Sequence, residues 1–185
     1  SYQEFETSKF IQTKLAEMGI PYQVMATTGV VGLITGKDPS SRIIALRADM
    51  DALPIEEQND VPYKSTNKGV MHACGHDVHT TCLLGVAKIL NQTKDQWEGT
   101  IKLIFQPGEE KNPGGASFMI KEGVLENPAP QKILALHVHT VLEPGQFSFR
   151  GGMVMASADE LYMTIHAKGG HAAAHHLTAD QIVIA

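Results

Sequence analysis

The chain has 185 residues, with 15 Lys and Arg against 20 Asp and Glu and a formal net charge of −5. This length suits one domain, or one domain and part of a second, and 43% hydrophobic with 19% charged residues excludes a disordered chain. The mild acidity, without a cluster of Lys and Arg, leaves no electrostatic footprint for nucleic acid, and no apolar run reaches the ~20 residues of a membrane-spanning helix.

The first part of the chain predicts one helix and two strands. Residues 4–18 carry apolar side chains on one helical stripe, and Gly19 ends this helix. Residues 30–36 and 42–49 are rich in β-branched and other apolar residues, and the turn-like KDPSS segment separates them. A long polar loop over 51–75 follows.

The middle of the chain alternates helices and strands. The patterns predict an apolar helix over 77–91, a strand over 99–107, a helix near 115–122 and a strand over 132–138. The last strand is apolar enough for burial on both faces. Strands that alternate with helices indicate an α/β fold with a mostly parallel sheet flanked by helices.

The pattern changes near residue 157. Residues 159–167 alternate between apolar and polar side chains, which predicts a half-buried strand in a sheet exposed on one side. We therefore expect one domain over residues 1–156 and a second over residues 157–185. Both ends of the chain look cut, because Ser1 and Tyr2 lead directly into a helix and a helix that starts near Thr178 runs directly into the apolar end of the sequence.

The nine histidines are the unusual feature of the composition, and several stand beside Cys, Asp or Glu. Cys74 and His76 lie two residues apart across a glycine, and a thiolate and an imidazole at this spacing can bind one borderline-soft divalent ion. Asp77 is interpreted as the partner that fixes the ring tautomer of His76. Cys82 falls on the apolar helix face and is expected in the core. Two cysteines make no disulfide framework, which, with no signal-peptide pattern at the N-terminus, favours a cytoplasmic protein.

Carboxylates follow two of the predicted strands. Asp49 and Asp51 end strand 42–49 and point to the same side, although a solvated loop mouth is the alternative. Glu109 and Glu110 follow strand 99–107. In such a pair one carboxylate can bind a metal while the other moves a proton, although this motif taken alone favours an ordinary solvated pair.

Histidines follow the last two predicted strands. His137 and His139 end strand 132–138, where they act as ligands or as hydrogen-bonded core histidines. His171 follows two glycines in the second domain, and an accidental histidine in a surface loop is the alternative there. The order of the clusters, at successive strand ends, predicts a hydrolytic site with one or two metal ions.

The motifs ALRADMDALPI, MHACGHDVHT, FQPGEE, LHVH and KGGHAAAHH, in this order, resemble the di-metal amidohydrolases and carboxypeptidases. This family includes hippurate hydrolases, N-acyl-amino-acid amidohydrolases and indole-acetyl-amino-acid hydrolases. The resemblance implies an incomplete zinc-peptidase-like catalytic domain over residues 1–156. It also implies that residues 157–185 begin an α+β lid or dimerisation domain that is truncated.

The resemblance also implies roles for individual residues. It makes Glu109 the general base and His171 a lid residue that binds the substrate carboxylate and the oxyanion in a neighbouring subunit. Four residues become metal ligands: Cys74, His76, Glu110 and His137. Four others line the site: Asp49, Asp51, Asp77 and His139.

The implied reaction is hydrolysis of an N-acyl amino acid or small peptide with two divalent metal ions, which the donor set allows to be Zn, Mn, Co or Ni. The full-length form is expected to be a homodimer. Family chains are roughly twice as long and carry a further histidine ligand in the missing part, for which His72, His79 or His139 are possible substitutes. The alternatives are a catalytically silent fragment that binds metal or a partner chain, and a structural zinc protein. The latter is disfavoured because a closed zinc site needs no Glu pair.

Overall fold

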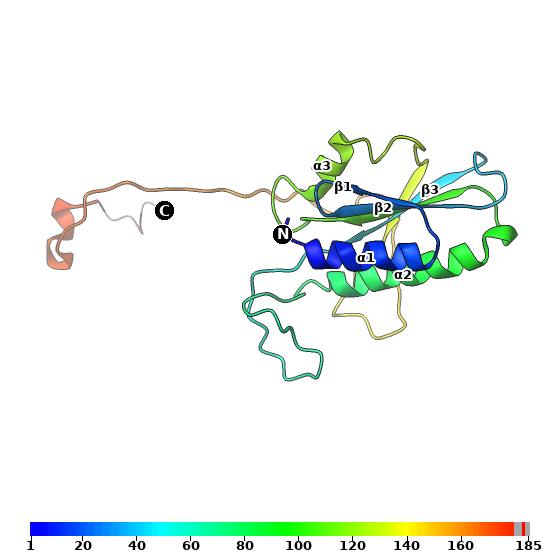
Figure 1. Cartoon of the computed structure of the whole chain (residues 1–185). Coiled ribbons are helices and arrows are strands. Elements are labelled where there is room, and N and C mark those ends of the chain that lie inside the picture. The colour runs from blue at the N-terminus through cyan, green and yellow to red at the C-terminus, as the bar shows by residue number, and fades with distance from the viewer. Residues whose placement is uncertain (180–182, 184–185) are drawn as a thin grey trace. The chain divides into compact units, whose positions relative to one another are not determined.

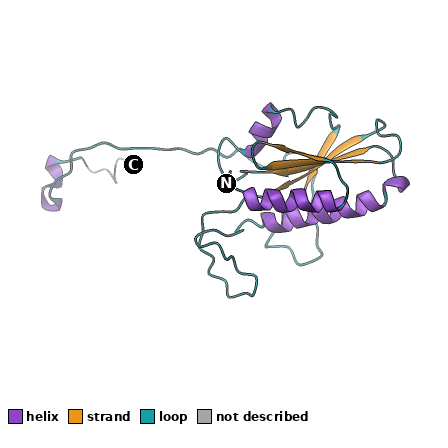
Figure 2. Ribbon diagram, in the orientation of Figure 1, coloured by secondary structure: helices purple, strands orange, loops and turns teal. Residues whose placement is uncertain are grey.

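The computed structural model of the chain describes residues 1–179 and residue 183, and the chain divides into two units, 1–146 and 147–185. The first unit is a five-stranded sheet with helices on both faces (Figures 1 and 2), which confirms the expected α/β class. Its strands are β1 (Tyr22–Met25), β2 (Gly29–Thr35), β3 (Ile43–Asp49), β4 (Thr100–Gln106) and β5 (Lys132–Ala135). Its helices are α1 (Phe5–Glu17), α2 (His76–Gln92), α3 (Gly115–Lys121) and the short 3-10 turn η1 (Lys94–Gln96).

The sheet has the strand order β1-β2-β4-β3-β5 and is mixed rather than parallel throughout. Strands β4, β3 and β5 run parallel, whereas β1 pairs with β2, and β2 with β4, in antiparallel fashion. The chain reaches β4 from its neighbour β3 through α2, because parallel neighbours need a crossover. It reaches β5 from β4 through α3, which carries the chain past β3 to the edge of the sheet. Strands β1 and β2 form a hairpin joined by a tight turn, which accounts for their antiparallel pairing.

Both faces of the sheet are buried, and the alternation along each strand assigns the side chains to two cores. Helices α1 and α2 lie side by side on one face, and α3 covers the other (Figure 1). In β4, Leu103 and Phe105 face α1 and α2, while Ile104 faces α3. The core on the α3 side contains Met25, Val31, Ala45, Ile104, Met119 and Val124. This two-sided burial explains why the strands read as nearly continuous apolar runs.

Strand β5 differs from expectation, because all four of its residues are exposed although burial on both faces was predicted. Among the described residues it is an edge strand with β3 as its single partner, so its apolar side chains border open grooves on the two sheet faces. Cys82 of α2 lines one of these grooves and is exposed, so its predicted place in the core is also wrong.

The second unit has little regular structure in its described part. Residues 159–167 form no strand, because no neighbouring strand pairs with them among the described residues, and the predicted half-buried strand is therefore wrong. The only helical segment described in full is the 3-10 helix η2 (Ala172–Leu177). The helix expected from Thr178 falls mostly outside the described residues, and the domain boundary after residue 156 stays a prediction. Within the described chain, no helix has the length and apolar character needed to cross a membrane.

Candidate metal centre

The predicted site residues of the first unit gather at the carboxyl ends of the parallel strands. Asp49 ends β3 and Asp51 follows two residues later, the Glu109–Glu110 pair follows β4, and His137 follows β5. The segment of Cys74 and His76 enters the same place as the loop that starts α2. Carboxyl ends of parallel strands meet at one edge of a sheet, so four sequence segments supply side chains to one centre.

His76 occupies the middle of this centre. Its Nδ1 lies 3.2 Å from Oδ1 of Asp51, and its Nε2 lies 3.7 Å from both Oδ2 of Asp49 and Oε1 of Glu110. His76 and the two aspartates are each only 1% exposed, which rules out a solvated loop mouth for this Asp pair. The two carboxylates do face the same pocket, as their spacing along the strand predicts.

The protonation of His76 and Asp51 is coupled through their contact. Burial lowers the pKa of His76, but the hydrogen bond to Asp51 and the charges of Asp49, Asp51 and Glu109 outweigh burial and raise that pKa above its usual value. Burial raises the pKa of Asp51, but donated hydrogen bonds lower it well below its usual range. The donors include the Ser1 hydroxyl at 2.7 Å and the Glu110 N–H at 3.1 Å. Asp51 therefore stays ionised.

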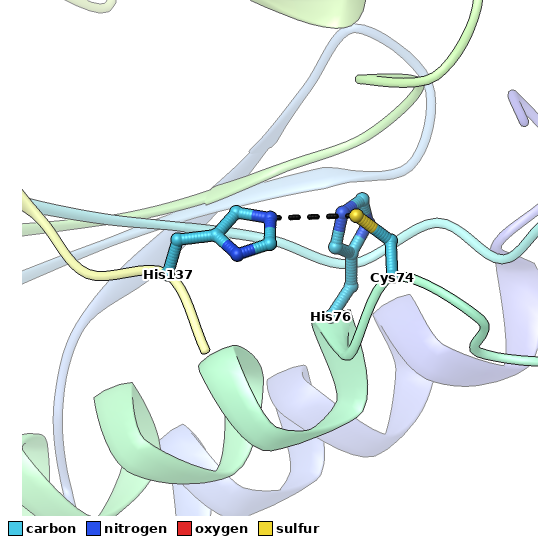
Figure 3. Close-up of side chains that lie close together, drawn as sticks. All are labelled: Cys74, His76 and His137. Carbon is cyan, nitrogen blue, oxygen red and sulfur yellow. Dashed lines mark hydrogen bonds between the residues drawn. The ribbon is translucent and has the colours of Figure 1, made fainter. Parts of the chain in front are cut away.

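Cys74 and His137 face each other beside His76 (Figure 3). The Cys74 Sγ lies 3.3 Å from Nε2 of His137. The Nδ1 of His137 lies 2.6 Å from the Val138 carbonyl oxygen, which accepts but cannot donate, so Nδ1 carries the proton and Nε2 offers a lone pair to the centre. Burial and the nearby carboxylates of Glu110, Glu109 and Asp49 raise the pKa of Cys74 to about 11.

His79 connects α2 to the segment that carries His137. Its Nδ1 donates a hydrogen bond to Oδ1 of Asp49 at 2.6 Å, and its Nε2 accepts one from the Val138 N–H at 3.0 Å. Both ring nitrogens are thus used, and none is left for a metal ion. His79, which the sequence offered as a substitute ligand, is instead a residue that positions its neighbours.

Gly75 allows the Val138 segment to approach α2. Its φ is +84°, and a Cβ at this position would lie 2.4 Å from Cγ2 of Val138. Any side chain at position 75 would therefore push Val138, and His137 with it, away from Cys74. The tight backbone that the sequence predicts between Cys74 and His76 is present.

Arg47 is a site residue that the sequence analysis missed. Its Nη1 donates to Oδ2 of Asp49 at 2.7 Å, and its Nε donates to Oε1 of Gln106 at 2.8 Å. Arg47 thereby balances the charge of the buried Asp49. Its position two residues before Asp49 on the same strand was the available signal, because side chains two apart share a face.

Two predicted residues of the first unit lie outside this centre. Asp77 is exposed, because the next residue along a helix points about 100° away, and Asp51 takes the expected role as partner of His76. His139 is exposed and accepts a hydrogen bond from the Val141 N–H at 3.4 Å. His171 is an exposed residue of the second unit, where its Nδ1 accepts a hydrogen bond from the Ala173 N–H.

The donors of this centre fit a divalent metal ion. Three groups of potential ligand atoms include His76. One adds Cys74 and His137, and another adds Glu109 and Glu110. The third adds Asp49 and His79, but both ring nitrogens of His79 are already hydrogen-bonded. Among the described residues, three buried side-chain atoms have no hydrogen-bond partner: Nδ1 of His72, Nε2 of His76 and Oε1 of Glu110. The last two lie 3.7 Å apart in this centre. Buried polar atoms normally have partners, and a cation between these two would supply one to each. A thiolate, imidazole and carboxylate set suits borderline transition metals.

Comparison with known proteins identifies the family. A family model described as peptidase family M20/M25/M40 matches residues 45–180. The chain belongs to this family. The IAA-amino acid hydrolase ILR1-like 5 of Arabidopsis thaliana is 47% identical over the whole chain, which covers 41% of that relative. The N-acyl-L-amino acid amidohydrolase of Geobacillus stearothermophilus is 42% identical, and the chain covers 49% of it.

Solved structures agree with this assignment. The YXEP protein of Bacillus subtilis, described as a dinuclear metal-binding peptidase of the M20 family, is 42% identical with a TM-score of 0.69. The match covers 74% of this chain and 38% of that one. This M20-family chain thus spans about half, or less, of the length of these relatives. The resemblance found in the sequence motifs is confirmed.

Proposed function

We propose that this M20-family chain carries the metal centre of a hydrolase that cleaves the amide bond of N-acyl amino acids or small peptides. The observation that supports this most is the pair of buried, unpartnered ligand atoms of His76 and Glu110 beside Cys74 and His137. The activities named for its relatives, an N-acyl amino acid amidohydrolase and an IAA-amino acid hydrolase, give the substrate class.

The proposed cofactors are two divalent ions, with Zn, Mn, Co and Ni all suited to the donors. The proposed ligands are Cys74, His76, Glu110 and His137. Such ions lower the pKa of a bound water and polarise a carbonyl group. The surrounding residues hold the ligands: Asp51 orients the His76 ring through Nδ1, and His79 fixes the backbone next to His137.

Glu109 is the proposed general base. Its side chain is exposed at the rim of the centre, where substrate and water can reach it. It accepts a proton from the water that attacks the amide carbon and donates this proton to the amine nitrogen as the C–N bond breaks. The products are a carboxylic acid and an amino acid. We further propose a cytoplasmic homodimer, in which His171 binds the substrate carboxylate and the oxyanion in the neighbouring subunit.

The test of this function is Glu109→Gln, measured as hydrolysis of N-acyl amino acids by the metal-loaded chain. Removing a general base lowers turnover by about 10²–10⁴-fold. Bound metal, measured by elemental analysis, should stay unchanged, because Glu110 and the other ligands remain. The matched control is Glu143→Gln, a change of an exposed glutamate in the loop after β5. Near-normal turnover by Glu109→Gln would exclude the proposed mechanism.

A second candidate is a chain that binds metal without turnover. The exposed strand β5 favours it, because both faces of this strand lack a covering layer among the described residues. The two candidates share the metal centre and differ only in hydrolysis. Bound metal with no hydrolysis of N-acyl amino acids or dipeptides, at any metal tested, would favour the second.

A further inference from the structure

The segment before α1 contacts the loop that follows β4, which contains both glutamates. The Tyr2 hydroxyl donates a hydrogen bond to the Lys111 carbonyl oxygen at 2.6 Å and accepts one from the Gly114 N–H at 3.0 Å. Tyr2 thus binds the loop over residues 108–114, here called the carboxylate loop, in its middle and at its far end. More than a hundred residues of sequence separate the two partners.

Glu4 binds the near end of the carboxylate loop. Its side chain is 8% exposed, and its Oε1 accepts a hydrogen bond from the Gly108 N–H at 3.3 Å and one from the Tyr2 N–H at 2.5 Å. Its Oε2 accepts a third from the Thr28 hydroxyl at 2.8 Å. A buried carboxylate with three donors is a fixed acceptor, so it also fixes the backbone of Gly108.

The Tyr2 ring leaves no room for a side chain at position 108. Gly108 has a φ of +55°, and a Cβ there would lie 2.2 Å from the ring. The Tyr2 ring also contacts Phe118 of α3. The two rings pack edge-to-face, with their centroids 5.8 Å apart. Ring packing and hydrogen bonds therefore act on the same loop from the same residue.

We propose that Tyr2 and Glu4 are positioning residues that fix the carboxylate loop for catalysis. The loop is also closed by the Gly115 N–H, which donates to the Gly108 carbonyl at 3.0 Å, so its orientation depends on the contacts made from outside. Held this way, Glu110 faces His76 and Glu109 stays at the rim. This inference rests on the proposed function for the roles of the two glutamates. The contacts of Tyr2 and Glu4 with the carboxylate loop do not depend on that function.

The first test measures amide hydrogen exchange in Tyr2→Phe and Glu4→Gln. We expect exchange in residues 107–115 to rise about three- to tenfold, since each change removes or weakens loop hydrogen bonds, while exchange in α2 stays unchanged. The matched controls are Tyr22→Phe in β1, at a side chain 39% exposed, and Glu6→Gln on the exposed side of α1. Exchange in 107–115 equal to that of the unmodified chain would overturn the proposal.

The second test titrates the same variants with Co²⁺, whose visible absorption reports its ligands. We expect Tyr2→Phe and Glu4→Gln to raise the dissociation constant about tenfold and to change the absorption, because a loop that is less well fixed no longer holds Glu110 against His76. Loss of contacts that orient a metal ligand typically lowers affinity by at least this much. Faster loop exchange with unchanged Co²⁺ affinity and spectrum would overturn the positioning role. Failure of the unmodified chain to bind Co²⁺ would instead contradict the proposed function. The exchange experiment would then still show whether Tyr2 and Glu4 fix the carboxylate loop.

Discussion

The two ring nitrogens of His76 have different roles. Nδ1 is held by Asp51, which is ionised because its hydrogen bonds lower its pKa, whereas Nε2 is buried and unpartnered between two carboxylates. The contact between Nδ1 and Asp51 sets the ring orientation, and Nε2 is left to bind a cation. Asp77, the neighbour in sequence, takes no part, because tertiary contacts rather than adjacency select the partner.

Cys74 gives a prediction about protons. Its pKa of about 11 keeps the thiol protonated at neutral pH, so binding of a metal ion as thiolate releases a proton. Protonated His76, with its raised pKa, adds to this release as pH falls. Metal affinity should therefore rise with pH between 6 and 8, by about tenfold per pH unit for each proton released.

Calorimetric titrations with Zn²⁺ in two buffers of different protonation enthalpy measure this release. We expect the observed enthalpy to depend on the buffer in the unmodified chain and to depend on it less in Cys74→Ser, since serine does not ionise. A heat of binding independent of buffer would show that Cys74 is not a thiolate ligand.

At the scale of elements, α2 and the end of β5 depend on each other through His79. His79→Leu would leave the Asp49 carboxylate and the Val138 N–H without this partner, at a cost of about 1–3 kcal/mol for each buried group. We expect the free energy of unfolding in urea to fall by about 2–5 kcal/mol. Cys82→Ala, on the exposed side of the same helix, is the control and should change stability little. Equal stability of both variants would contradict the link between α2 and β5.

Some elements follow from local sequence, and others do not. The ends of α1, α2 and β4 agree with the sequence within a few residues, because periodicity and glycines mark them. Strand β1 was missed, since three of its four residues are exposed and it shows no buried pattern. The expected burial of β5, and the expected strand over 159–167, depended on partners that lie far away in sequence or are absent from the described residues.

The same holds for the site. The sequence predicted both aspartates, the Cys-His pair, the Glu pair and His137, and the structure brings these residues together. The carboxylates and His137 were marked by their places at or just after strand ends, and Cys74 and His76 by their spacing across a glycine. It did not locate Tyr2, Glu4 or Arg47. These act through contacts with other segments, and their residue types carry no metal signature by themselves.

At the scale of the whole molecule, a metal ion would link segments that are distant in sequence. Cys74 and His137, which lie 63 residues apart, would share an ion with His76. Binding to the folded state alone stabilises it by about 2.7 kcal/mol when the free ion is at 100 times its dissociation constant. We expect Zn²⁺ or Mn²⁺ to raise the unfolding temperature and EDTA to reverse this. Ca²⁺ is the control, because it prefers oxygen ligands. Equal shifts with Ca²⁺ would indicate nonspecific binding to carboxylates.

The most direct test is the metal content of the purified chain, measured by elemental analysis after equilibration with Zn²⁺ and gel filtration. We expect about two ions per chain, and markedly fewer in a Cys74→Ala, His76→Ala double variant that remains folded by circular dichroism. No retained metal, or the same amount in the double variant, would contradict the metal centre.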